Sequence, residues 1–115
     1  PTDLGTALIG TGFAYDPEVR RRQAEVLPTV LPAVRDLRRG GAAALDLCLL
    51  AAGHLDGFWE RGLAPWDRAA GGLIAAEAGA VVTRLGTAEP MTIVAAAPSI
   101  HDDLVALLEA AGAGF

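Results

Sequence analysis

The sequence from Gly57 to Gly72 reads Gly57-Phe-Trp-Glu60-Arg-Gly-Leu-Ala-Pro-Trp66-Asp67-Arg-Ala-Ala-Gly-Gly72. Two carboxylates, Glu60 and Asp67, lie on either side of a turn, and Asp67 is expected to open an Ala- and Gly-rich helix. Unpaired N–H groups and the positive end of the helix dipole favour anions at such a helix start. The Asp67 carboxylate can also turn outward and hold a cation. The stretch therefore indicates a site that could join a metal ion to a phosphate.

Strand and helix patterns alternate on both sides of this stretch. Asp16-Pro17-Glu18 provides an N-cap, a proline in the first turn and an early acid. Ser99 and Asp102 form a capping pattern before the last helix. The expected strands cover residues 7–13, 34–37, 55–60, 80–83 and 91–95, and the expected helices cover residues 17–27, 42–52, 67–78 and 100–111. Strands separated by helices favour a layered α/β fold, in which helices cover a sheet.

The composition fits one compact domain. The chain has 115 residues, of which 52% are hydrophobic and only 5% aromatic, so the core must be built from small aliphatic side chains. All nine basic residues are arginines, set against 14 acids, and the formal net charge is -5. Binding to a nucleic acid backbone requires many cationic contacts acting together, so a nucleic acid partner is disfavoured.

A cytoplasmic location is expected from the cysteine content. Cys48 is the only cysteine, so the fold does not depend on an internal disulfide. It lies in an apolar run and is expected to be a small core residue. No apolar run reaches the roughly 18 residues of a membrane span. We therefore expect no membrane partner.

The two carboxylates each have a simpler explanation when read alone. Asp67 could be an ordinary N-cap, a role that aspartate fills often. However, the small residues of Ala69-Ala70-Gly71-Gly72 would let a ligand or another backbone approach the helix closely. Glu60 could be a solvated charge at the end of a strand. It follows Phe58-Trp59, so it could instead leave a buried strand and accept hydrogen bonds from a polyol.

Other polar positions leave alternatives open. The segment Gly40-Gly41-Ala42-Ala43-Ala44 begins a helix in which Leu45, Cys48, Leu49 and Ala52 share one face. Its small residues serve either tight helix packing or a ligand at exposed backbone N–H groups. One arginine of the Arg38-Arg39 pair could face a phosphate, although a structural ion pair fits equally well. His101 is expected at the surface, and no second histidine stands at metal-ligand spacing from it.

Several segments of the chain resemble the inositol monophosphatase family. Trp66-Asp67-Arg-Ala-Ala-Gly71, followed by Glu77-Ala78-Gly79, is similar to the C-terminal signature of these magnesium-dependent, typically lithium-sensitive phosphomonoesterases. The matching segments in the order of the chain are Gly12-Phe-Ala-Tyr-Asp16, Gly41-Ala-Ala-Ala-Leu-Asp-Leu-Cys48, Ala52-Gly53 and Asp56-Gly57-Phe-Trp-Glu60. The resemblance covers nearly the whole chain.

The resemblance implies a layered α/β sugar-phosphatase fold, with residues 1–115 forming its C-terminal half: a mixed sheet flanked by helices. It implies that Asp67 is a ligand of a catalytic Mg²⁺ and lies near substrate hydroxyls. Glu60 would bind a substrate hydroxyl, and Gly41, Ala42 and Ala43 would line the substrate ring with backbone contacts. Ala42 stands where the family usually has Ser or Thr, so a side-chain hydrogen bond is not expected there. The family also implies a homodimer.

The remaining metal ligands of the family come from an N-terminal half that this sequence does not contain. They are a glutamate and an Asp-Pro-x-Asp-Gly segment, so the chain is expected to be a fragment or a processed product and to lack phosphatase activity alone. The expected substrate of the complete protein is inositol monophosphate or a related polyol phosphate. Histidinol phosphate, fructose 1,6-bisphosphate and an adenosine bisphosphate remain alternatives on the same scaffold. A non-catalytic assembly domain is the alternative from another class.

Overall fold

The computed structural model describes residues 1–115 and contains one mixed sheet of five strands. The strands are β1 (Leu8–Thr11), β2 (Asp36–Arg38), β3 (Gly57–Arg61), β4 (Val81–Leu85) and β5 (Thr92–Ala96), in the order β2-β1-β3-β5-β4. Strand β1 pairs in parallel with β2 and β3, whereas β5 pairs antiparallel with β3 and β4. The five strands predicted from the sequence are confirmed, with boundaries shifted by one or two residues.

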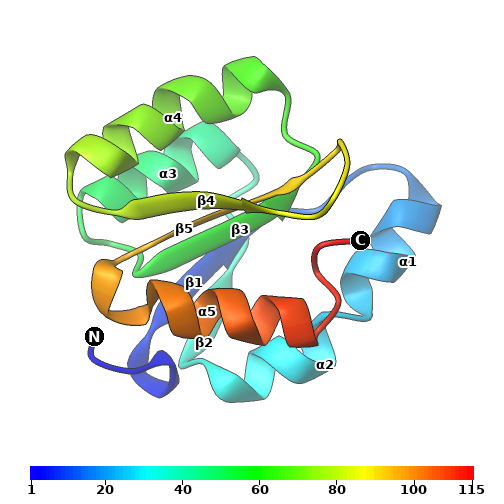
Figure 1. The fold of residues 1–115 in the computed structure, drawn as a ribbon, viewed down its shortest axis with the longest axis horizontal. Coiled ribbons are helices and arrows are strands. Elements are labelled where there is room, and N and C mark those ends of the chain that lie inside the picture. The colour runs from blue at the N-terminus through cyan, green and yellow to red at the C-terminus, as the bar shows by residue number, and fades with distance from the viewer.

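Helices cover both faces of the sheet (Figure 1). They are α1 (Pro17–Ala24), α2 (Leu27–Val30), α3 (Ala43–Ala51), α4 (Pro65–Glu77) and α5 (Pro98–Ala110), with short 3₁₀ segments η1 (Leu4–Thr6) and η2 (Leu31–Ala33). In Figure 1, α3 and α4 lie side by side on one face, whereas α5 and α2 lie on the other. The layered α/β architecture predicted from the sequence is therefore confirmed. None of these helices has the length and hydropathy that a membrane crossing requires.

Proline sets the first residue of three helices. The predicted start of α1 is confirmed: Pro17 is its first residue, and the Asp16 carboxylate accepts a hydrogen bond from the Glu18 N–H at 3.3 Å. The helix predicted for residues 17–27 ends at Ala24, and a separate turn, α2, contains Pro28. Proline lacks an N–H and fixes φ near the helical value, so it suits a first turn and interrupts a helix interior.

The predicted starts of α4 and α5 were wrong by two residues. Helix α4 begins at Pro65, so Asp67 lies in its first turn and does not open it. Helix α5 begins at Pro98, and its N-cap position makes no side-chain hydrogen bond. The Ser99 hydroxyl instead donates to the Pro1 carbonyl at 2.6 Å. In both helices the proline provides the first helical residue, ahead of the polar side chain that resembled a cap.

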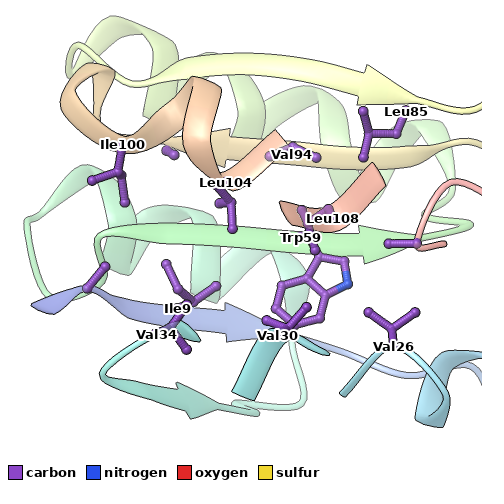
Figure 2. Close-up of a cluster of buried hydrophobic side chains, with 13 residues drawn as sticks. Ile9, Val26, Val30, Val34, Trp59, Leu85, Val94, Ile100, Leu104 and Leu108 are labelled. Atoms are coloured by element: carbon purple, nitrogen blue, oxygen red, sulfur yellow. The ribbon is translucent and has the colours of Figure 1, made fainter. Parts of the chain in front are cut away.

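The core forms two layers because successive side chains of β3 point to opposite faces of the sheet. Trp59 belongs to the cluster beneath α5 and α2, which Figure 2 shows with Ile9, Val94 and Leu104 around it. Phe58 belongs to the cluster beneath α3 and α4, where it is fully buried. Phe58 and Glu60 therefore share one face of the strand, so the carboxylate of Glu60 points to the side that α3 and α4 cover.

Three side chains lie differently from their prediction. Helix α3 turns Asp46, Leu47 and Leu50 inward, so the predicted face that contains Cys48 points away from the sheet and Cys48 is only half-buried. The helix is apolar on nearly every side, and periodicity alone could not select its inner face. His101 was expected at the surface but is only 7% exposed, and its Nε2 lies 3.0 Å from the Thr83 hydroxyl. The sheet side of α5 includes His101, so the hydrogen bond satisfies a buried ring.

Gly71 allows α4 to approach α3 closely, and this gives a stability prediction. A Cβ at Gly71 would lie 2.9 Å from Leu47 Cδ1 and 3.0 Å from Leu47 Cβ, whereas one at Gly72 would meet nothing closer than Val82 Cγ1 at 3.9 Å. We expect Gly71→Ala to lower the free energy of unfolding by about 1–3 kcal/mol through overpacking. Gly72→Ala is the matched control and should raise stability by up to about 1 kcal/mol, because alanine favours helix over glycine. Denaturant unfolding of both variants measures the difference, and equal stabilities would contradict the packing described.

Candidate active site

The candidate site lies at the edge of the sheet where three parallel strands end. Gly12 follows β1, Gly40 follows β2 and Glu60 lies near the end of β3. Helices α3 and α4 begin at the same edge, because each follows one of these parallel strands after a short turn. Ligands of open α/β sheets bind outside the carboxyl ends of parallel strands. The topology therefore brings the predicted site residues at the start of α3, at the end of β3 and at the start of α4 to the same edge of the sheet.

Among the carboxyl groups of the chain, Glu60 has the pKa that departs furthest from its ordinary value. Its side chain is half-buried, and it occupies the space next to Gly12, where any Cβ would collide with Oε1. Burial raises the pKa of Glu60 to about 7; the neighbouring Asp46 and Asp67 carboxylates also raise this pKa, and Arg39 opposes them. A group with such a pKa exchanges its proton near neutral pH and can either accept or donate a hydrogen bond. Glu60 follows the buried residues Gly57, Phe58 and Trp59 of β3, as the sequence indicated.

Asp46 was not identified from the sequence as a site residue. It lies on the inner face of α3, is 3% exposed, and fills the space next to Gly40 in the same way that Glu60 fills the space next to Gly12. Burial raises the pKa of Asp46, and the Arg39 guanidinium opposes this shift. The available signal was an acid between Leu45 and Leu47 in an otherwise apolar run. A charged residue in such a run is rarely buried without a partner or a function.

Asp67 does not cap its own helix. It is half-buried in the first turn of α4, Ala64 occupies the N-cap position without a side-chain hydrogen bond, and the Asp67 carboxylate accepts no hydrogen bond from the protein. The ordinary N-cap explanation is therefore wrong. Asp67 lies close enough to Glu60 to raise the pKa of that carboxyl group. The two carboxylates singled out from the sequence thus share one electrostatic environment.

The start of α3 presents backbone groups without bulky side chains. Gly41 has φ +84°, a conformation that favours glycine, and Ala42 occupies the N-cap position without a side-chain hydrogen bond. The first hydrogen bond of the helix runs from the Asp46 N–H to the Ala42 carbonyl at 2.9 Å. The N–H groups from Ala43 to Leu45 precede this bond and have no protein acceptor. They are free to bind a ligand oxygen.

The two arginines of the Arg38-Arg39 pair make different interactions. Arg38 forms an exposed ion pair with Asp36 at 2.9 Å, the structural alternative weighed from the sequence. Arg39 forms no ion pair; its guanidinium lies 5.9 Å from the centre of the Phe13 ring and acts electrostatically on Asp46 and Glu60. The only positive charge that acts on both raised carboxyl groups therefore belongs to Arg39.

The carboxylates at this edge meet one requirement of a divalent cation site but not the other. Carboxylate oxygens are the ligands that Mg²⁺ prefers, so the donor chemistry of Asp67 and its neighbours fits this ion. The number of donors is too small for a complete site, because no group of three or more His, Cys, Asp or Glu side chains is arranged to hold a metal ion. None of the five principal cavities is lined by Glu60 or Asp67. The candidate site is therefore an open edge of the sheet and not a closed cavity, and these residues line one side of it.

Comparison with known proteins assigns the family. The family model described as the inositol monophosphatase family matches residues 1–113, and the chain belongs to this family. An inositol-1-monophosphatase of Mycobacterium bovis is 55% identical over 111 residues, which cover 93% of this chain and 38% of that protein. A putative Nus factor SuhB of Neisseria meningitidis is 42% identical over 113 residues, which cover 94% of this chain and 43% of that protein.

A solved structure supports the same assignment. Mycobacterium tuberculosis SuhB superposes with a TM-score of 0.88 at 52% identity, covering 96% of this chain and 44% of that structure. The family resemblance noted in the sequence is thus confirmed. The chain spans less than half the length of the relatives and the structure it matches.

Proposed function

We propose that the full-length protein is a Mg²⁺-dependent phosphomonoesterase acting on inositol monophosphate or a related polyol phosphate, and that this chain supplies the substrate-binding half of the site. The observation that carries the proposal is the proximity of Glu60 and Asp67 at the edge where α3 begins with three N–H groups that have no protein acceptor. Acceptors for hydroxyls and donors for anionic oxygens are the groups that a polyol phosphate requires. The family assignment adds the reaction class.

Five residues of the chain have defined roles in this proposal. Asp67 donates a carboxylate oxygen to Mg²⁺ and lies near substrate hydroxyls, and Glu60 accepts a hydrogen bond from a hydroxyl. The backbone of Gly41, Ala42 and Ala43 contacts the substrate ring. When bound, Mg²⁺ would activate water and neutralise charge on the leaving oxygen. The remaining ligands would come from the N-terminal half implied by the family, so this chain alone is expected to release no phosphate.

A panel of phosphate esters tests the reaction and its substrate. The full-length protein should release phosphate from inositol monophosphate faster than from histidinol phosphate, fructose 1,6-bisphosphate or an adenosine bisphosphate. EDTA should abolish the release, and added Mg²⁺ should restore it. A preference for one of the other esters would assign a sister specificity on the same scaffold. The absence of release from every ester with Mg²⁺ present would contradict the proposed function.

A second candidate is an assembly role that requires no catalysis, on this same family scaffold. It is favoured by the Neisseria relative, which is named a putative Nus factor SuhB. The Asp67→Asn variant separates the two functions in cells, because it removes one carboxylate charge without changing the shape of the side chain. A phenotype rescued by this variant would favour assembly. A phenotype that requires Asp67 would favour phosphate ester hydrolysis.

A further inference from the structure

A cavity separate from the candidate active site lies along α3. Its volume is about 300 Å³, and neither Glu60 nor Asp67 lines it. Leu49 contributes from α3, Leu8 from the first residue of β1 and Leu55 from the turn before β3. These three leucines are hereafter the apolar floor. Small-molecule sites of this size lie at the lower end of the usual range, so the cavity suits a ligand of few atoms.

Asp46 is the one acidic residue that lines this cavity, and its carboxylate has no partner in the protein. The residue is 3% exposed, and its oxygens accept no hydrogen bond and form no ion pair. Every fully buried side-chain oxygen of the chain has a partner, so the Asp46 oxygens keep some exposure, and it is toward the cavity. A nearly buried carboxylate without a partner is costly. Asp46 therefore points to a ligand that carries a positive charge.

Arg39 lines the same cavity and provides the opposite charge. Its guanidinium opposes the rise in the pKa of Asp46 without forming an ion pair with it, so the charged atoms of the two side chains are more than about 4 Å apart. Arg38 also lines the cavity, but it is paired with Asp36 at 2.9 Å. His54, an exposed residue beyond the end of α3, lines it as well. The cavity therefore offers one carboxylate and one unpaired guanidinium, separated by a gap.

The charges of these two groups select among classes of ligand. Asp46 would repel a phosphate ester or another anion, and Arg39 would repel an amine that has no acid group. An uncharged apolar molecule would bury both charges without pairing either of them. A free α-amino acid carries an ammonium and a carboxylate on one carbon atom. It can therefore pair with both groups at once while its side chain extends over the apolar floor.

We propose that this cavity binds a free α-amino acid with an apolar side chain. The ammonium of the ligand donates hydrogen bonds to the Asp46 carboxylate, and the Arg39 guanidinium donates to the carboxylate of the ligand. The side chain of the ligand packs on the apolar floor. Hydrogen bonds between charged groups are the strong ones, so the two charges fix the orientation of the amino acid. The proposal does not rest on the phosphatase function, because it uses neither Glu60 nor Asp67.

Isothermal titration calorimetry of the full-length protein in EDTA tests the proposal without any variant. The probes are L-leucine, L-isoleucine, L-methionine and L-phenylalanine, and the tightest of them should bind with a dissociation constant below about 1 mM. Glycine, which has no side chain to cover the apolar floor, should bind at least about tenfold more weakly. The N-acetyl derivative of the tightest probe lacks the ammonium, and its amide lacks the carboxylate. Each derivative should also bind at least about tenfold more weakly.

Two variants of the full-length protein locate the bound amino acid. Asp46→Asn and Arg39→Gln should each weaken binding at least about tenfold, because each leaves one charge of the ligand unpaired. Arg35→Gln replaces an exposed arginine that does not line the cavity, so it is the matched control and should bind as the wild type does. Asp67→Asn should also bind as the wild type does, because the proposed phosphatase site is separate from this cavity.

Four outcomes would overturn the proposal, and none depends on catalytic activity. The absence of binding by all four amino acids would show a cavity without this ligand. Equal binding of the blocked derivatives would show that the charges are not recognised. Unchanged binding by folded Asp46→Asn and Arg39→Gln variants would place the amino acid elsewhere. Binding that is lost in Asp67→Asn would place it in the proposed phosphatase site.

Discussion

Replacing Asp67 by asparagine in the full-length protein is expected to lower the rate of phosphate release by at least about hundredfold. The Asp67 carboxylate accepts no hydrogen bond from the protein and does not cap α4, so the substitution removes a charge without removing a structural contact. An amide is a weaker ligand for Mg²⁺ than a carboxylate. Initial rates measured across a range of Mg²⁺ concentrations should show that the variant requires more Mg²⁺ than the wild type.

Asp103→Asn is the matched control for this prediction. Asp103 is an exposed acid on α5, on the opposite face of the sheet from α4, and its replacement should leave both the rate and the Mg²⁺ dependence unchanged. Unfolding midpoints of both variants should stay near the wild-type value. An Asp67→Asn variant with wild-type turnover at limiting Mg²⁺ would refute the role of Asp67 as a cation ligand.

Replacing Glu60 by glutamine is expected to stabilise the metal-free protein at alkaline pH. The pKa of Glu60 is about 7 in the folded chain, against an ordinary value of 4.5. Between these values the folded state binds the proton more tightly than the unfolded state, so stability falls as pH rises from 4.5 to about 7 and stays low above it. Glu60→Gln removes this loss and should raise the free energy of unfolding at pH 8 by about 1–3 kcal/mol, the lower end reflecting solvent access.

Denaturant unfolding in EDTA at several pH values measures this effect. The variant and the wild type should have similar stabilities near pH 4.5 and diverge toward pH 8. Asp46, whose pKa burial also raises, should leave a smaller slope of the same sign in the variant. Glu77→Gln, which replaces an exposed glutamate on α4, is the control and should retain the wild-type pH curve. A Glu60→Gln variant that is less stable than the wild type at pH 8 would contradict the prediction, because it would show that the protein stabilises the charged carboxylate of Glu60.

The alternation of helices and strands could be predicted from the sequence because it depends mainly on local residue patterns. Glycines and prolines mark the turns, and short apolar runs between them gave all five strands. The same locality explains the errors at the starts of α4 and α5. Asp67 and Ser99 have the chemistry of an N-cap, but Pro65 and Pro98 had already begun each helix. Whether a polar residue caps a helix depends on where the backbone enters the helix, and residue type alone does not predict that position.

The inner face of α3 could not be derived from periodicity. The helix is apolar on both sides, and its one charged residue, Asp46, lies on the buried side. Its position next to Gly40 depends on the end of β2, a contact between two separate elements. The pairing of Glu60 with Gly12 is likewise a tertiary contact. The sequence singled out Glu60 and Asp67 as candidate site residues and the family resemblance gave them roles, whereas the electrostatic effect of Asp46 and Arg39 on Glu60 required the fold.

The most direct test of the central claim is the position of a divalent cation in crystals of the full-length protein. Mn²⁺ prefers the same oxygen ligands as Mg²⁺, and its anomalous scattering locates it without ambiguity. A Mn²⁺ ion should lie about 2.0–2.3 Å from a carboxylate oxygen of Asp67, with Glu60 facing the same cavity. Mn²⁺ bound elsewhere, with the Asp67 carboxylate turned into packed hydrocarbon, would contradict the assignment of this edge as half of a phosphatase site.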